Sequence, residues 1–324
     1  MSGKYRIVTG LLVVLLGIGA AASDVRAVEV PAIAVFGDSL SDTGNLYDAV
    51  GGADIPFVLS WDDYYQGRFS NGPLWIEHLA DRIVPNVGSA SVQAVGLGGL
   101  NFAFGSAKTG SGTNFLGVPN MGTQVDSYLG ALGGQSPGDT LFVVWGGAND
   151  LYAGTPFDSV AEDIAGHVAR LAQQGGHQFL VPNLSPLGDL PLHINTTNRD
   201  ELNTLTADFN AHLASELTLV RSDYDVTIHE FDISTLFQAV SADPQAYHDE
   251  LSIVDQAALT GDPTQADQYL FWDELDDVSH PTRVGHALIA EAAYQTMIPE
   301  PGSVALLVTG VAALTLRRRG RVRA

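Results

Sequence analysis

The stretch FGDSLSDTGN at residues 36–45 places one serine, Ser39, just after an apolar run ends. Gly37 follows that run and permits a tight turn there. A serine hydroxyl presented in this way could act as a nucleophile, although serine is weak and needs a neighbouring base. The alternative is an ordinary polar turn, since Gly-Asp-Ser by itself is a common tripeptide. The role of Ser39 therefore depends on what the rest of the chain brings to it.

Strand-like and helix-like segments alternate along the chain that must position Ser39. Short runs rich in Val, Ile and Phe predict buried parallel strands, and apolar residues at helical spacing predict helices. The alternation predicts an α/β fold, a three-layer α/β/α sandwich with a mainly parallel central sheet. Ser39 would stand at the carboxyl edge of that sheet, and a helix starting nearby would aim free N–H groups at it. The predicted strands are 32–37, 141–147, 177–184, 226–233 and, as a short fifth candidate, 100–104; the predicted helices are 72–83, 157–174, 199–220 and 282–297, the last capped by Thr282.

Residues 1–27 have the pattern of a secretory signal peptide. Two basic residues precede an apolar stretch at 7–22, and small residues follow it. Cleavage fits after Ala22 or, preferably, after Ala27. A retained membrane helix is disfavoured because the apolar run is short and ends in a small-residue site. We therefore expect an exported protein.

The C-terminal residues 299–324 combine three features in order. Pro299-Glu300-Pro301 would end the preceding helix, an apolar segment of 15 residues follows at 302–316, and arginines begin at Arg317. This order resembles the PEP-CTERM sorting signal of Gram-negative bacteria, in which an exosortase-type protease releases the protein from its tail. The resemblance implies transient anchoring in the inner membrane, then delivery to the cell surface or extracellular matrix. The alternative is a plain C-terminal anchor with its positive charge kept inside.

Residues 28–298 remain as one domain that is large enough to bury its own core. The formal net charge of the whole chain is −22, and residues 28–298 alone retain 7 basic and 35 acidic residues, which gives −28. Because a domain with this negative charge repels phosphate backbones, we expect no nucleic-acid partner. The absence of cysteine excludes disulfides, thiol nucleophiles and thiolate metal sites. No His, Asp and Glu cluster has metal-ligand spacing, and no cofactor is expected.

The ten residues at 36–45 resemble the first block of the GDSL esterase/lipase family, also called SGNH hydrolases. That family has four separated blocks that hold Ser, Gly, Asn and His, and three further stretches of this chain are similar to the other blocks in order. A segment at 67–80, GRFSNGPLWIEHLA, extends the similarity, which runs from Ile33 to about Tyr294. The resemblance implies a flavodoxin-like SGNH-hydrolase fold with Ser39 as nucleophile.

Two of these stretches would supply the oxyanion hole together with the Ser39 N–H. VVWGGAND at 143–150 is similar to the Asn block, which implies that the side-chain amide of Asn149 donates to the oxyanion. NFAFGSAKTG at 101–110 is similar to the Gly block, whose donor is a backbone N–H. Gly105 is the preferred donor, and Ser106 is the alternative. Removal of one such donor costs roughly 3–4 kcal/mol of transition-state stabilisation.

DDVSHPT at 276–282 is similar to the last block, D-x-x-H. The similarity implies that His280 is general base and then general acid, and that Asp277 orients its imidazole. The family often reads F-W-D-x-x-H, whereas FWD here ends at Asp273 and four residues follow before Val278. Asp273 therefore has the expected neighbours and Asp277 the expected spacing, and the spacing favours Asp277.

The resemblance implies an exported serine esterase that hydrolyses lipid or simple acyl esters through an acyl-enzyme. One alternative is an O-acetyl esterase of extracellular polysaccharide, which the sorting tail favours. Another is a non-catalytic glycan-binding matrix protein on the same fold. Aromatic residues at 57–69 could line an acyl groove or stack on sugars, namely Trp61, Tyr64 and Tyr65. The expected partners are an ester substrate and an exosortase-type processing protease.

Overall fold

The computed structural model describes residues 28–55, 60–247, 251–256, 263–275 and 278–298. These residues belong to one compact unit, Ala27–Ile298. The expected leader at 1–27 and sorting tail at 299–324 lie outside the described residues. Within the described ranges, no helix has both the length and the apolar character needed to cross a membrane.

Four parallel strands form the central sheet, and their spatial order follows the chain. Every residue of the first two strands is buried, because helices cover both faces of the sheet. The predicted α/β fold with a parallel sheet is confirmed, and the four strands match their predicted ranges to within two residues. They are β1 (Ile33–Gly37), β2 (Leu141–Trp145), β3 (Gln178–Pro182) and β4 (Thr227–Phe231).

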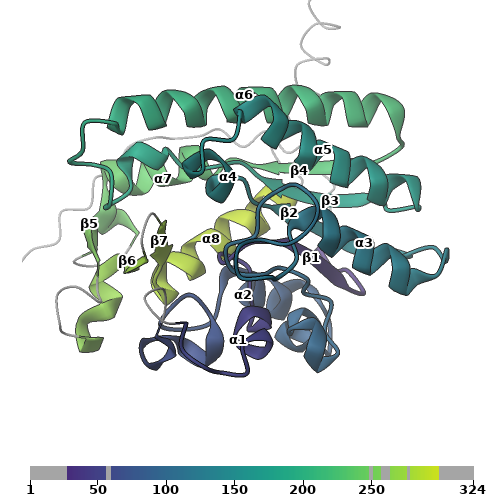
Figure 1. Ribbon diagram of the computed structural model, residues 1–324, viewed down its shortest axis with the longest axis horizontal. Helices are drawn as coiled ribbons and strands as arrows, with labels where there is room; N and C mark the ends of the chain where they lie inside the picture. The colour runs from purple at the N-terminus through teal and green to yellow at the C-terminus, as the bar shows by residue number, and fades with distance from the viewer. Residues whose placement is uncertain (1–27, 56–59, 248–250, 257–262, 276–277, 299–324) are drawn as a thin grey trace, which may run out of the picture. The chain divides into compact units, whose positions relative to one another are not determined.

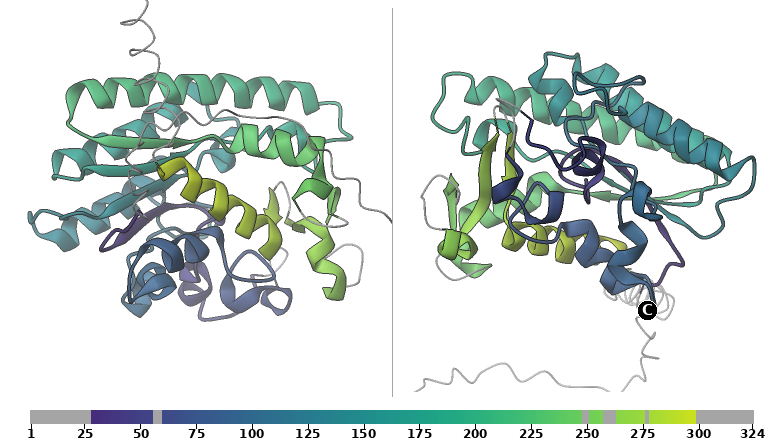
Figure 2. Two further views of the ribbon diagram at one scale, coloured as in Figure 1. Left: turned by 180° about the vertical axis from the view of Figure 1, so that it is seen from behind. Right: turned by 60° about the horizontal axis from the view of Figure 1, so that its bottom comes forward.

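Figures 1 and 2 show helices on each side of this sheet. One face is covered by α3 (Met121–Leu132), α5 (Phe157–Gln173) and α6 (Arg199–Asp223), which pack around Phe142 and Phe179. The other face is covered by α2 (Trp75–Ile83) and α8 (Arg283–Met297). Four of these five helices were predicted; α3 was not, because its Gly and Thr residues weaken the helical pattern.

Thr282 caps α8 as predicted. Its Oγ1 accepts a hydrogen bond from the N–H of Gly285 at 3.3 Å. The same hydroxyl donates to Tyr269 O at 2.7 Å, so the cap also ties the start of α8 to the preceding hairpin. The first residues of α8 are thereby held beside the strand that begins at Tyr269.

The fifth candidate strand, at 100–104, is not a regular strand. Its backbone runs parallel to β1, where Val35 donates to Leu100 O at 3.0 Å and Phe102 donates to Val35 O at 2.8 Å. Only an isolated bridge forms there, between Val35 and Asn101. Phe104 also donates to Gly37 O at 3.2 Å, but the N–H of Gly37, which would continue the ladder, donates to Gln124 Oε1 at 2.9 Å.

A second, three-stranded sheet follows β4 and was not predicted. After α7 (Ile233–Ala242) it contains β5 (Ser252–Gln256), β6 (Tyr269–Leu275) and β7 (Val278–Pro281). β6 and β7 form an antiparallel hairpin in which Asp273 stands opposite His280. β7 leads directly into α8, which packs on the central sheet, so the hairpin places His280 next to that sheet.

Short helices complete the connections. α1 (Asn45–Ala49) follows the Ser39 stretch, and α4 (Ala148–Tyr152) follows β2. Gly147 precedes α4 with a φ of 113°, a conformation that L side chains rarely adopt. The 3₁₀ helices are η1 (Trp61–Asp63), η2 (Tyr65–Gly67), η3 (Gly88–Val92), η4 (Val95–Leu97), η5 (Leu187–Asp189), η6 (Pro244–Ala246) and η7 (Pro263–Gln268).

Candidate active site

Ser39 lies two residues beyond β1, at the carboxyl edge of the central sheet. The last residue of this strand must be glycine, since a Cβ at Gly37 would lie 2.4 Å from Trp145 O of β2. Asp38 then turns the chain, and its Oδ1 accepts the N–H of Leu40 at 3.0 Å. The tight turn thus presents Ser39 at the position that the sequence predicted for it.

His280 reaches Ser39 across a sequence separation of 241 positions. His280 Nε2 lies 2.8 Å from Ser39 Oγ, and both residues are buried. Ser70 Oγ donates to Pro281 O at 2.9 Å and so holds the end of β7 that carries the histidine. At this distance an imidazole can take the proton of the serine hydroxyl.

Asp277 and Asp273 are the two candidates for the carboxylate that orients His280. Asp277 lies outside the described residues, so its contact with His280 stays a prediction. Asp273, the alternative, pairs with His280 in the register of the β6–β7 ladder. Directly opposed residues of antiparallel strands are cross-strand neighbours. The backbone register therefore keeps Asp273 as a candidate beside Asp277.

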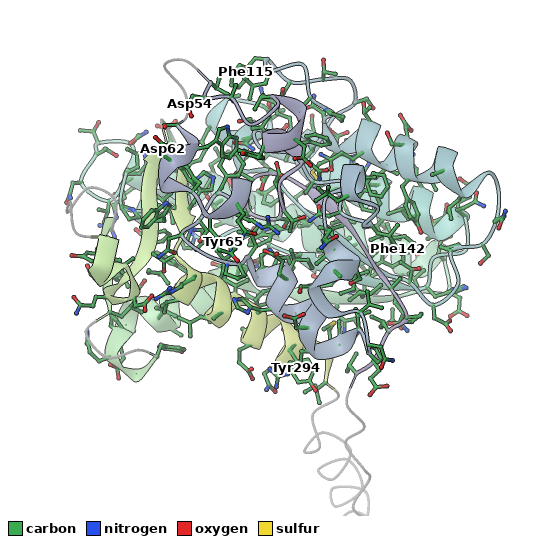
Figure 3. All side chains as sticks on the ribbon, turned by 90° about the horizontal axis from the view of Figure 1, so that it is seen from below. Asp54, Asp62, Tyr65, Phe115, Phe142 and Tyr294 are labelled. Carbon is green, nitrogen blue, oxygen red and sulfur yellow. The ribbon has the colours of Figure 1, made fainter. Side chains whose placement is uncertain are left out.

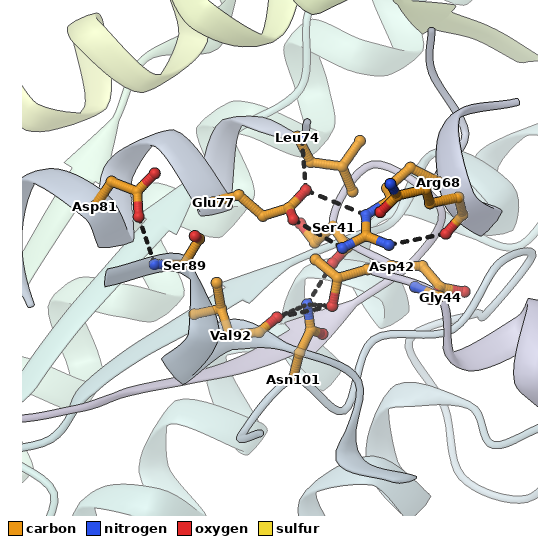
Figure 4. Close-up of polar contacts among 12 residues, drawn as sticks. Ser41, Asp42, Gly44, Arg68, Leu74, Glu77, Asp81, Ser89, Val92 and Asn101 are labelled. Carbon is orange, nitrogen blue, oxygen red and sulfur yellow. Dashed lines mark hydrogen bonds and ion pairs between the residues drawn. The ribbon is translucent and has the colours of Figure 1, made fainter. Parts of the chain in front are cut away.

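An aromatic wall lies against His280. The ring centroid of Phe69 is 5.1 Å from that of the imidazole, and Trp61 and Tyr64 pack edge-on against Phe69. An ion pair of 2.8 Å between Arg68 and Glu77 fixes this segment on α2 (Figure 4). Since only 7% of Trp61 is exposed, it supports the aromatic wall against His280 and does not form an open stacking surface.

Asn149 occupies the first turn of α4, beside the carboxyl end of β2. Its Nδ2 donates to Ala107 O at 3.0 Å. A side-chain amide nitrogen carries two hydrogens, so this bond fixes the group and leaves one donor for an oxyanion. The predicted donor role of Asn149 is compatible with this geometry.

Gly105, the preferred backbone donor, is already engaged. Its N–H donates to Asp42 Oδ2 at 2.8 Å, so in this structure it does not face an oxyanion position. The choice of Gly105 therefore needs correction in favour of the alternative, Ser106. Among the residues that the structure describes, neither the Ser39 N–H nor the Ser106 N–H has a hydrogen-bond partner.

The sequence reasoning missed Asp42, which links the serine stretch to the Gly105 loop. Its carboxylate also accepts the N–H groups of Gly44, Asn45 and Leu46 at 2.9, 2.5 and 3.1 Å (Figure 4 shows Asp42 beside Gly44). The expected helix near Ser39 begins only at Asn45, and the N–H groups of its first two residues donate to Asp42, so they do not point at the serine. An Asp just before a short helix is the signal that could have revealed this cap.

Three buried carboxylates hold the loops of this region. Burial raises the pKa of Asp38, Asp42 and Asp150 to about 6, although backbone N–H groups oppose the shift in each case. Asp150 follows Asn149 and accepts the N–H of Thr109 at 2.9 Å, which ties α4 to the Gly105 loop. Each carboxylate therefore anchors a segment that carries a candidate active-site group.

His286 on α8 predicts a pH dependence of stability. Burial, followed by repulsion from His280 and His78, lowers its pKa to about 3, and neither ring nitrogen has a hydrogen-bond partner among the described residues. Because the unfolded state, with a pKa of about 6.5, binds this proton more strongly, stability falls as pH drops from 6.5 towards 3. We expect the free energy of unfolding of His286→Leu to increase, relative to that of the wild type, by roughly 1.4 kcal/mol for each pH unit below 6.5.

Urea unfolding of wild type and His286→Leu at pH 8, 6 and 5 measures this difference. The comparison between variants matters because the raised pKa values of Asp38, Asp42 and Asp150 act in the opposite direction, stabilising the fold as pH drops from 6 to 4. A difference that does not change with pH would contradict the prediction.

An apolar cavity of about 90 Å³ is lined by sequence neighbours of the serine–histidine pair, although neither Ser39 nor His280 is among its lining residues. Leu40, which follows Ser39, lines it together with Ser279 and Pro281, which flank His280. Further wall residues come from β2, α4, α7, α8 and the segment after β3, and they include Trp145, Ala148, Leu184, Ile233, Phe237 and Leu288. The apolar lining offers an environment for hydrocarbon.

The sequence pattern of the GDSL-like lipase/acylhydrolase family matches residues 33–293. The chain belongs to this family. It is 27% identical over 289 residues to the thermolabile hemolysin of Vibrio parahaemolyticus, which covers 80% of this chain and 62% of the hemolysin. It is 26% identical over 322 residues to a GDSL esterase/lipase of Arabidopsis thaliana, with 82% of each chain covered. A solved structure of a lipolytic G-D-S-L protein from Veillonella parvula is similar, with 17% identity, 82% of this chain and 97% of that chain covered, and a TM-score of 0.44.

This GDSL protein is therefore a hydrolase that acts on ester bonds. Among its described residues, no group of three His, Cys, Asp or Glu side chains is placed to hold a metal ion. The site just described contains side chains for acid–base and nucleophilic chemistry, which suits ester hydrolysis without a cofactor.

Proposed function

We propose that this GDSL hydrolase is an exported serine esterase that cleaves carboxylic esters with lipid or simple acyl groups. The observation that carries the proposal is the 2.8 Å contact between Ser39 Oγ and His280 Nε2 at the carboxyl edge of the sheet. A hydroxyl and an imidazole at this distance form the activated nucleophile that acyl transfer needs.

In the proposed mechanism, Ser39 Oγ attacks the ester carbonyl carbon while its proton passes to His280 Nε2. The carbonyl oxygen becomes an oxyanion, which the N–H groups of Ser39 and Ser106 and the Asn149 amide would stabilise. The intermediate collapses, the C–O bond to the alcohol breaks, and His280 returns the proton to the leaving alkoxide. Water then attacks the acyl-enzyme by the same route and releases the acid and free Ser39. Asp277 or Asp273 would orient the imidazole and stabilise its charged form.

The apolar cavity supports an acyl group as the part of the substrate that this enzyme selects. Its lining residues Leu40, Ser279 and Pro281 are the sequence neighbours of Ser39 and His280, the residues that would perform the chemistry. Burial of each methylene of an acyl chain contributes about 0.8 kcal/mol, so the cavity would favour chains longer than acetyl.

A chain-length series of aryl esters, from acetyl to dodecanoyl, tests this function beside an acetylated polysaccharide. Ser185 lines the cavity, and Ser185→Phe would fill part of it. We expect Ser185→Phe to lower kcat/KM for octanoyl esters relative to acetyl esters by roughly tenfold, because displaced methylenes lose their contacts. Ser185→Ala is the matched control and should change that ratio less than about twofold.

A second candidate rests on the sorting tail at 299–324. An enzyme released from the inner membrane by an exosortase-type protease would meet acetylated polysaccharide at the cell surface or in the extracellular matrix. The same series separates the two candidates, since preference for acetyl groups on polysaccharide over every aryl ester would favour the O-acetyl esterase. Glycan binding without hydrolysis of any ester would favour a non-catalytic matrix protein and would overturn both.

A further inference from the structure

The candidate oxyanion donor Ser106 sits in an unfavourable backbone conformation. Residues 104–107 form a turn that is closed by the N–H of Ala107 and the carbonyl of Phe104 at 3.1 Å. Ser106, the third residue, has a φ of 61°, whereas Gly105 is not in the positive-φ region. These signs are those of a type II turn, which favours glycine or asparagine at its third position. A serine there is held against its own preference.

A type I turn would close the same four residues without this strain. The two turn types differ mainly by rotation of the central peptide, here the one between Gly105 and Ser106. In the type I form the third residue has a negative φ, which serine adopts readily. The same rotation would turn the Ser106 N–H to the opposite side of the turn. Something outside the turn must therefore favour the observed orientation.

Asn114 holds the carbonyl of this central peptide. Its Nδ2 donates to Gly105 O at 3.2 Å, and its Oδ1 accepts the N–H groups of Leu116 and Val118 at 2.9 and 3.3 Å. The two backbone donors determine which end of the amide is oxygen, so the nitrogen must face Gly105. In a trans peptide the C=O and N–H point in opposite directions. Because Asn114 bonds the Gly105 carbonyl, the Ser106 N–H of the same peptide points away from Asn114.

Neighbouring contacts hold the two ends of the turn but not its central peptide. Asp42 accepts the N–H of Gly105, which belongs to the preceding peptide, at 2.8 Å. Asn149 donates at 3.0 Å to the carbonyl of Ala107, which belongs to the Ala107–Lys108 peptide after the last residue of the turn. The Asn114 bond is the contact, among the described residues, that acts on the Gly105–Ser106 peptide itself.

We propose that Asn114 is a positioning residue of this esterase, which keeps the Gly105–Ser106 peptide turned so that the Ser106 N–H faces the oxyanion. The inference rests on the proposed function, because it concerns an oxyanion that forms only during acyl transfer. Asn114 itself does not contact the reacting atoms. It acts through the turn, and the strain at Ser106 makes that action necessary.

Kinetics of Asn114→Ala with a simple aryl ester test the proposal. Without the Asn114 bond to Gly105 O, the type I turn dominates, and fewer molecules have the Ser106 N–H facing the oxyanion. We therefore expect kcat to drop roughly 5- to 30-fold, with KM within about twofold of the wild-type value. Adding Ser106→Gly should restore most of kcat, because glycine accepts positive φ without strain. Asn114→Asp is a second variant that keeps the acceptor for Leu116 and Val118 but cannot donate to Gly105, and Ser106→Gly should rescue it likewise.

Phe115→Ala is the matched control on the same loop. Phe115 is 76% exposed and lies at the edge of the view in Figure 3, so its loss should leave kcat unchanged. Full activity of Asn114→Ala, or a loss that Ser106→Gly does not rescue in either Asn114 variant, would overturn the proposal. Failure of the proposed function is distinct, since the wild type itself would then hydrolyse no ester, or would do so unchanged after Ser39→Ala.

Discussion

Replacing Ser39 by alanine is expected to lower kcat for a simple aryl ester by at least about 10⁴-fold, with KM changed less than about threefold. Alanine keeps the fold but removes the oxygen that lies 2.8 Å from His280 Nε2. His280→Ala should cause a loss of similar size, and the double variant should be no worse, because the two groups act as a unit. Steady-state kinetics with purified protein measure these effects.

Labelling with a serine-reactive organophosphate complements the kinetics. Wild type should take up one equivalent and lose activity in proportion, whereas Ser39→Ala should take up none. Ser41→Ala is the matched control, since Ser41 is also buried in this stretch but its Oγ bonds the indole of Trp75 at 3.2 Å. It should retain labelling and activity. A Ser39→Ala enzyme with more than a tenth of wild-type kcat would remove Ser39 from the mechanism.

The second large effect concerns the carboxylate that supports His280. One of Asp277→Asn and Asp273→Asn should lower kcat about 10³- to 10⁴-fold, because an amide can neither fix the required tautomer nor stabilise the imidazolium. The other should lower kcat by less than about tenfold. Motif spacing favours Asp277, whereas the ladder register, with Asp273 opposite His280, favours Asp273. Kinetics of the two single variants decide between them.

Glu274→Gln serves as the control for this comparison, since it removes one negative charge from the same hairpin. Its kcat should stay within about threefold of wild type. If both aspartate variants keep more than a tenth of wild-type kcat, the hairpin does not supply the orienting carboxylate, and the D-x-x-H assignment is wrong.

Hydrophobic patterning predicted the elements that build the site, but not those with mixed composition. β1 and β2 are continuous apolar runs because both faces of their sheet are covered, and such runs are visible in a sequence. The hairpin of β6 and β7 was missed because its strands carry acidic and polar residues beside aromatic ones. At 100–104 the apolar pattern predicted a strand, but the Gly37 N–H that would extend the pairing with β1 donates to the side chain of Gln124.

The sequence by itself determined the fold class, the order of the four blocks and the positions of Ser39, Asn149 and His280 within them. These features are local, since each depends on residue types within a few positions along the chain. Only the tertiary structure showed that Asp42 engages the Gly105 N–H and leaves that of Ser106 without a partner. A backbone donor carries no mark in the sequence, because every residue except proline has one. Which N–H stays available depends on contacts between distant segments, and these exist only after the chain has folded.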